Sequence, residues 1–177
     1  MRKYNIIDLF SGCGGLLDGF LQSGLYCTVA SVEWEKYPVL TLRKRLKEKY
    51  GVLDAEQSVV FFDMQRTDEL LHGFEDPKYG KNPGLLKLVG KKKIDFIIGG
   101  PPCQAYSVAG RVSVDQKEKP DYRNYLFEYY LKVVSTFRPK MFVFENVPGM
   151  LSAMPDGTPI IDLIRRDMAN VGYEIID

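Results

Sequence analysis

The sequence has 177 residues and a formal net charge of +1, with 45% hydrophobic and 27% charged residues. This composition is typical of one globular domain with a sizeable core, and the near-neutral charge gives no argument for or against a polyanionic partner. No apolar stretch is long enough to span a bilayer and no signal-peptide core follows the N-terminus, so we expect a cytoplasmic protein, nucleoid-associated if bacterial. The spacing of the three cysteines predicts free thiols and no metal site.

Short runs of β-branched and aromatic residues alternate with stretches of helical periodicity along the chain. We predict, in order, strand 4–10, helix 15–24, strand 26–33, helix 37–50, strands 58–63 and 93–100, helix 121–137, strand 141–146, helix 160–172 and a candidate strand 173–177. The segments 74–92 and 104–120 are predicted to be irregular. This alternation indicates an α/β fold: a doubly wound, mostly parallel sheet with helices on both faces, in one domain over residues 1–177.

Ligands of such sheets bind outside the carboxyl ends of the strands. The first strand runs into "DLFSGCGG", where Gly12 and Gly14 permit a tight turn before a helix N-terminus. The second strand ends at Glu33, an acceptor for ribose hydroxyls, next to Trp34, which is suited to stacking on a purine. The third ends at Asp63, an acceptor for a base amino group. A plain turn, a surface acid and a core indole are the alternatives for each residue alone, but together they favour an adenosine-type pocket.

The fourth and fifth predicted strands end in reactive side chains. "GGPPCQAYS" places Cys103 after two prolines, and "FENVPGMLS" places Glu145 at the end of the next strand. A thiolate can add to an electrophilic ring carbon while a carboxylic acid protonates the adjoining ring nitrogen. The alternatives are a small buried thiol and a carboxylate that caps a strand end.

These motifs, with "EW" after the second strand and "RNYLF" before the fifth, resemble the ordered motifs of the DNA (cytosine-5) methyltransferases over residues 6–176. The resemblance implies a Rossmann-like fold that binds S-adenosylmethionine and duplex DNA. It implies that the cysteine thiolate attacks carbon 6 of a flipped cytosine, that the glutamate contacts nitrogen 3, and that carbon 5 takes the methyl group. It also implies restriction-modification or housekeeping methylation.

The site residues that the resemblance implies fall into three groups. The catalytic pair is Cys103 and Glu145. The cofactor-binding residues are Phe10, Gly12, Gly14, Glu33, Trp34, Asp63, Pro101 and Leu126. Gln104, Ser107 and Arg111 belong to a DNA-binding loop, and we expect residues 104–120 to be poorly ordered without DNA.

Several family features have no counterpart in this sequence: a Gln-x-Arg-x-Arg strand, the target recognition domain and the C-terminal helix that closes the cofactor pocket. We therefore expect a fragment of a longer enzyme or one subunit of a split enzyme. Its partner would be the C-terminal half or a second subunit, and the isolated chain would be inactive, with residues 173–177 disordered, displaced or paired with a neighbour. A transfer-RNA cytosine-5 methyltransferase and a nucleotide-binding module without chemistry are the alternatives.

Overall fold

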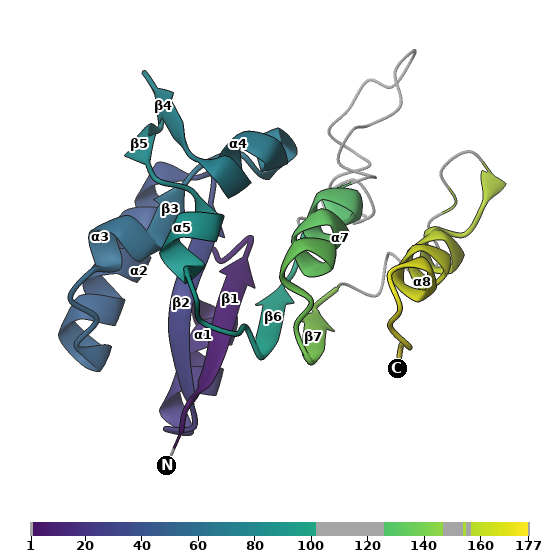
Figure 1. Ribbon diagram of the computed structural model, residues 1–177, viewed down its shortest axis with the longest axis horizontal. Helices are drawn as coiled ribbons and strands as arrows, with labels where there is room; N and C mark the ends of the chain where they lie inside the picture. The colour runs from purple at the N-terminus through teal and green to yellow at the C-terminus, as the bar shows by residue number, and fades with distance from the viewer. Residues whose placement is uncertain (1, 102–125, 147–153, 155–156, 177) are drawn as a thin grey trace, which may run out of the picture.

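A five-stranded parallel sheet forms the centre of the molecule (Figure 1). The structure is a computed structural model that describes residues 2–101, 126–146, 154 and 157–176. The strands, in the spatial order β3-β2-β1-β6-β7, are β1 (Tyr4–Leu9), β2 (Tyr26–Glu33), β3 (Val59–Phe61), β6 (Phe96–Gly99) and β7 (Met141–Phe144). The chain starts at the central strand, builds outward to β3 and then returns past β1 to β6. The order therefore reverses between β1 and β6, which is where doubly wound sheets bind their ligands.

Helices cover both faces of the sheet, as predicted. Successive residues of a strand point to opposite faces, so Ile6 packs with α1 (Gly15–Gln22), α2 (Lys36–Tyr50) and α3 (Ala55–Ser58). Its neighbour Ile7 packs into a second cluster. That cluster draws on α4 (Thr67–His72), α5 (Leu85–Val89), α7 (Leu126–Phe137) and α8 (Ile160–Asn170). Burial on both faces explains why these strands are continuous apolar runs.

The segment predicted to be irregular, residues 74–92, is largely ordered, and that prediction is wrong. It contains a hairpin of β4 (Phe74–Asp76) and β5 (Gly80–Asn82) followed by α5, and it comes after the short helices η1 (Met64–Arg66) and α4. Phe74 stacks on Phe62 with ring centroids 3.8 Å apart, and Arg66 Nη1 donates to Asp76 Oδ2 at 2.7 Å. Elements this short show no hydrophobic period in the sequence, so tertiary contacts determine their conformation.

The candidate strand at 173–177 is also wrong for its described residues, 173–176, which form no strand. Gly172, with φ +88°, ends α8 in a Schellman turn: its N–H donates to Ala169 O and that of Tyr173 donates to Met168 O. The Tyr173 ring then lies 5.2 Å from that of Phe142 on β7. The turn redirects the chain across the side chains of β7 instead of along its backbone.

Close packing between β1 and β6 requires glycine at position 99. Gly99 is in register with Leu9, and a Cβ at Gly99 would collide with the Leu9 carbonyl oxygen. We expect Gly99→Ala to lower the free energy of unfolding by about 1–3 kcal/mol. Gly19→Ala on α1, where nothing lies within 4 Å of the added carbon, should raise it by about 0.5–1 kcal/mol. Urea denaturation of both variants checks this, and equal effects would contradict the packing argument.

Candidate active site at the carboxyl edge of the sheet

The turn after β1 has an unusual backbone. Phe10 has φ +55°, a left-handed conformation that bulky residues seldom adopt, and Gly12 and Gly14 follow with φ +52° and +81°. Gly14 caps the start of α1, and a Cβ there would collide with Leu42 of α2. Strained backbone of this kind concentrates at ligand sites. The glycine turn predicted from "DLFSGCGG" is therefore formed.

The carboxylate of Glu33 fastens this turn to the end of β2. Its Oε2 accepts a hydrogen bond from the Gly12 N–H and its Oε1 accepts one from the Glu35 N–H, both at 2.8 Å. The side chain is buried, and Trp34 beside it is half-buried. Each carboxylate oxygen can accept more than one hydrogen bond, so this arrangement still permits the predicted contact with ribose hydroxyls.

Asp63 lies two residues beyond β3, at the same edge of the sheet. Its Oδ1 accepts a hydrogen bond from the Gln65 N–H at 2.9 Å and caps η1. The half-buried side chain thus has a structural contact that the sequence did not predict. Its role toward an adenine amino group stays a prediction.

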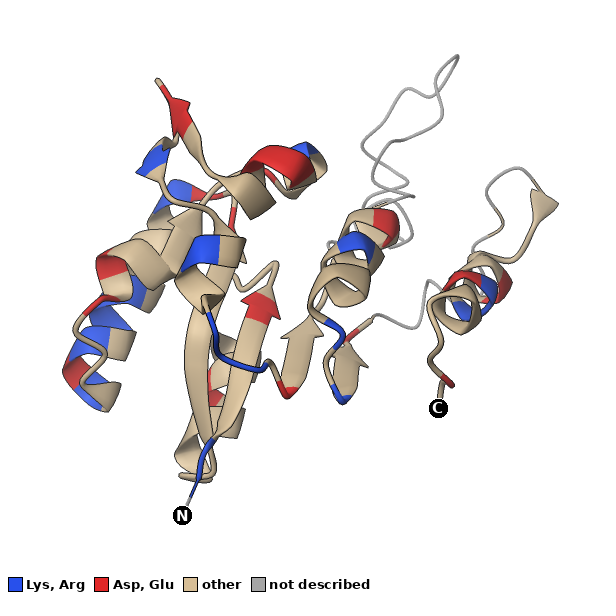
Figure 2. Cartoon of the chain, in the orientation of Figure 1, with Lys and Arg blue, Asp and Glu red and all other residues tan. Residues whose placement is uncertain are grey.

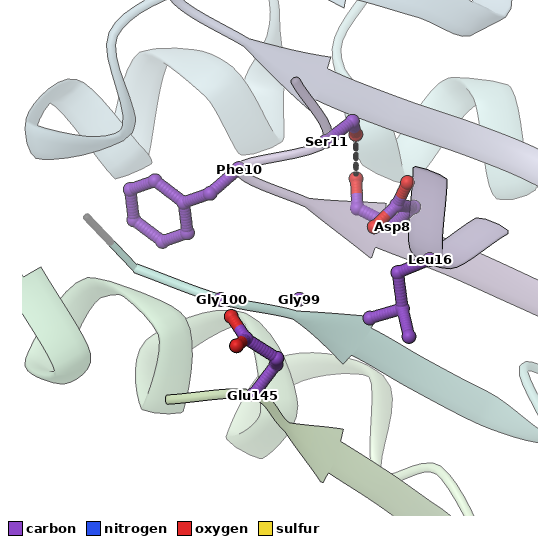
Figure 3. Close-up of a pocket in the computed structure, with 7 residues that line it drawn as sticks. All are labelled: Asp8, Phe10, Ser11, Leu16, Gly99, Gly100 and Glu145. Atoms are coloured by element: carbon purple, nitrogen blue, oxygen red, sulfur yellow. Dashed lines mark hydrogen bonds between the residues drawn. The ribbon is translucent and has the colours of Figure 1, made fainter. Parts of the chain in front are cut away.

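A cavity of about 350 Å³ opens where β1, β6 and β7 end (Figure 3). Glu145 enters it from the end of β7, held by a hydrogen bond from its N–H to the Gly99 carbonyl at 2.9 Å. A Cβ at Gly100 would collide with the Glu145 carboxylate, so glycine there lets the acid lie against β6. The residues lining the cavity are Asp8, Phe10, Ser11, Leu16, Gly99, Gly100 and Glu145. The structure thus brings the predicted Phe10 and Glu145 together.

Asp8 is a site residue that the sequence analysis missed. It is 1% exposed, and its Oδ2 has no hydrogen-bond partner among the described residues. Burial raises the pKa of Asp8 to about 8, opposed by the Ser11 hydroxyl and reinforced by the Glu33 carboxylate. An aspartate inside the apolar run "YNIIDLF" was the available signal.

Tyr130 of α7 connects the two strands that carry Gly99 and Glu145. Its buried hydroxyl lies 3.1 Å from the carbonyl oxygens of both Ile97 on β6 and Val143 on β7. Burial raises the pKa of Tyr130 well above its ordinary value, with a further contribution from Asp8. The hydroxyl therefore stays protonated and holds the strand ends beside the cavity in place.

The remaining predicted site residues are divided between two groups. Pro101 and Leu126 are buried and flank the segment 102–125, which the structure does not describe. Neither is among the described residues that line the cavity, and the same holds for Gly12, Gly14, Glu33, Trp34 and Asp63. Cys103, Gln104, Ser107, Arg111 and the predicted loop 104–120 lie outside the described residues. Among the residues that the structure describes, no cluster of three His, Cys, Asp or Glu side chains is suited to a metal. No helix in this part of the chain has the length and apolarity of a membrane span.

The sheet order and its helices define an α/β protein with a Rossmann-like methyltransferase fold. A crystal structure of a Spodoptera frugiperda DNMT2 mutant has the same fold, with a TM-score of 0.56 and 19% identity over 96% of this chain and 41% of that one. The chain belongs to the C-5 cytosine-specific DNA methylase family, because the model of that family matches residues 4–176. The resemblance inferred from the motifs is thereby confirmed.

Curated bacterial relatives match nearly the whole chain. Type II methyltransferase M.Bpa9945I of Bacillus paralicheniformis is 32% identical, with 97% of this chain aligned to 46% of the relative. Type II methyltransferase M.DdeI of Desulfomicrobium norvegicum is 34% identical, with 97% of this chain aligned to 34% of the relative. The chain thus spans less than half the length of these relatives.

Proposed function

We propose that this chain carries the catalytic centre of an enzyme that transfers a methyl group from S-adenosylmethionine to carbon 5 of cytosine in DNA. The observation that carries the proposal is the cavity at the topological switch, in which the strained Phe10 turn faces Glu145. In a family of cytosine C-5 methylases, a turn suited to the cofactor opposite an acid suited to the base is the arrangement that this reaction needs.

The residues present fit S-adenosylmethionine, which supplies the electrophilic methyl group on a sulfonium. A cavity of about 350 Å³ is in the range of small-molecule sites. The Asp8 carboxyl, whose Oδ2 has no hydrogen-bond partner among the described residues, lines that cavity, and a positively charged ammonium would bind this oxygen and favour the ionised form. Glu33, already held by two N–H groups, is preorganised to accept hydrogen bonds from the ribose.

Two side chains act on the cytosine in this proposal. The Cys103 thiolate adds to carbon 6, and Glu145 contacts ring nitrogen 3 as the ring accepts the electron pair. Carbon 5 would then form its bond to the methyl group as the bond from that methyl to the donor's sulfonium sulfur breaks, which leaves the demethylated cofactor as a thioether. The carbon 5 proton would pass to water, and the bond from the Cys103 sulfur to carbon 6 would break to release the thiolate. Glu145 is exposed at the cavity, where a base can reach it.

The names of the relatives suggest the biological setting. Both quoted bacterial relatives are Type II methyltransferases, so we propose that this activity modifies DNA in a restriction-modification system. The substrate is then a cytosine within duplex DNA that leaves the base stack to reach Glu145.

Cofactor binding by the chain itself tests the proposal. Glu33→Ala removes the predicted ribose acceptor and the hydrogen bond that holds Gly12 of the turn, so its affinity for S-adenosylmethionine should fall by about 1.5–3 kcal/mol, or roughly 10- to 150-fold. Glu35→Ala is the matched control, because it removes an equal charge from an exposed neighbour and leaves the Glu35 N–H in place. Isothermal calorimetry measures both. Equal affinities for the two variants would remove Glu33 from the cofactor site.

A further inference from the structure

Positive charge is concentrated at the amino edge of the sheet, opposite the cavity. In Figure 2 the segments that lead into β1, β6 and β7 are coloured blue at their Lys and Arg residues, and they lie next to one another at this end of the strands. The Lys and Arg residues of these segments are all exposed. We call this surface the basic edge, and it consists of Arg2, Lys3, Lys91, Lys92, Lys93, Arg138 and Lys140.

The negative charge within these segments is a single buried carboxylate, Asp95. Its Oδ1 lies 3.0 Å from Lys140 Nζ, and its Oδ2 lies 3.7 Å from Arg2 Nη2 and accepts the Asn5 N–H at 3.0 Å. One carboxylate cannot neutralise seven cations. Because the whole chain carries only +1, the basic edge differs in charge from the rest of the molecule.

Hydrogen bonds hold the three segments of the basic edge side by side. Asn5 Nδ2 donates to the Lys93 carbonyl at 2.7 Å, and the Lys140 N–H donates to the Asp95 carbonyl at 3.0 Å. Adjacent strands lie about 4.8 Å apart, so the three strand starts span about 10 Å. Each strand of duplex DNA places one phosphate per 3.4 Å or so of helix axis, and a row of this length therefore meets several of them.

An aromatic ring is exposed among these cations. Tyr4, at the start of β1, is 41% exposed, and Lys140 Nζ lies 5.6 Å from its ring centroid. The rings of Tyr26 and Phe96 brace it at 5.7 and 5.8 Å. Tyrosine side chains are among the groups that contact phosphate oxygens of duplex DNA, so an exposed tyrosine held among these cations suits a phosphate-binding surface.

We infer that the basic edge binds the phosphate backbone of DNA, at a site separate from the cavity that takes the target base. This inference rests on the proposed function. The six residues of β1 separate the two edges by about 20 Å, and they face opposite ways. The basic edge therefore holds a second stretch of DNA, independent of sequence, and keeps the protein on the polymer.

The test uses the chain itself and a short mixed-sequence duplex carrying a fluorescent label. One variant replaces Lys91, Lys92 and Lys93 with glutamine. The matched control replaces Lys36, Lys44 and Lys47, three exposed lysines of α2, in the same way. Anisotropy titrations between about 50 and 200 mM salt give the slope of log affinity against log salt, whose magnitude falls by about 0.9 for each phosphate that the protein no longer neutralises.

We expect the Lys91–Lys93 variant to lose about two to three units of slope and at least about tenfold in affinity, while the α2 variant keeps both. An equal loss in the two variants would overturn the inference, as would equal competition by polyglutamate, which would indicate an acidic protein partner instead. S-adenosylmethionine affinity should be the same in all three proteins. If the proposed function is wrong, the calorimetry will show no binding of S-adenosylmethionine, whereas the DNA titrations test the basic edge alone.

Discussion

A Cys103→Ser variant is expected to lose methyl transfer to DNA and to keep its affinity for S-adenosylmethionine. The attacking group in the proposed reaction is a thiolate, and a serine hydroxyl is far less ionised than a thiol at neutral pH. Cofactor binding should persist because the proposed role of the sulfur is toward the base. The assay follows labelled methyl groups onto mixed-sequence duplex DNA, with the C-terminal half of a Type II relative added to the chain.

The other cysteines provide the control for this experiment. Cys27 is a half-buried residue of β2 whose Sγ lies 3.2 Å from Asn5 Oδ1, at the amino end of the strands. Cys27→Ser makes the same atomic change away from the cavity and should keep methyl transfer near the wild-type level. Substantial turnover by Cys103→Ser would overturn the covalent mechanism, whatever the control shows.

The second large effect concerns pH and stability. The pKa of Asp8 is raised from 3.8 to about 8 in the folded protein, so between these values the folded state holds a proton that the unfolded state has lost. The contribution of Asp8 to the free energy of unfolding is therefore fully present below about pH 4. It is lost as the pH rises toward 8, by up to about 1.4 kcal/mol for each pH unit. Asp8→Asn removes the titration, and its stability relative to wild type should rise by about 4 kcal/mol between pH 4 and 7.

Asp95 supplies a control of opposite sign. Burial opposes ionisation of this carboxyl, but the Asn5 N–H and Lys140 prevail and lower its pKa. The stabilisation that ionised Asp95 contributes is present above the ordinary pKa of an aspartate and is lost as the pH falls through the lowered pKa of the folded protein. Asp95→Asn should therefore be less stable than wild type at pH 7, with a gap that closes on acidification. Urea denaturation across this pH range checks both variants, and parallel curves for Asp8→Asn and wild type would refute the raised pKa.

Local sequence predicted the elements with long apolar runs. β2 and α2 match their predicted ranges within a residue, since each is long enough to show its period. The hairpin of β4 and β5 was missed because three-residue strands carry no period, and the contact of Phe62 with Phe74 forms only after folding. The helix ending near Gly172 was predicted, but the strand expected after it was wrong, because the Tyr173 ring packs on Phe142 of β7.

By itself, the sequence determined the fold class, the glycine turn, the family, and the position of Glu145 at the end of a strand. These properties depend on short-range patterns: apolar periodicity, glycine positions and ordered motifs. Only the tertiary structure decided that Glu145 shares a cavity with Asp8, that Glu33 binds the turn, and that the cations of three distant segments form one edge. These facts depend on the parallel pairing of β1 with β6 and of β6 with β7, which brings together residues 90 and 45 positions apart, and on desolvation, which no local pattern reports.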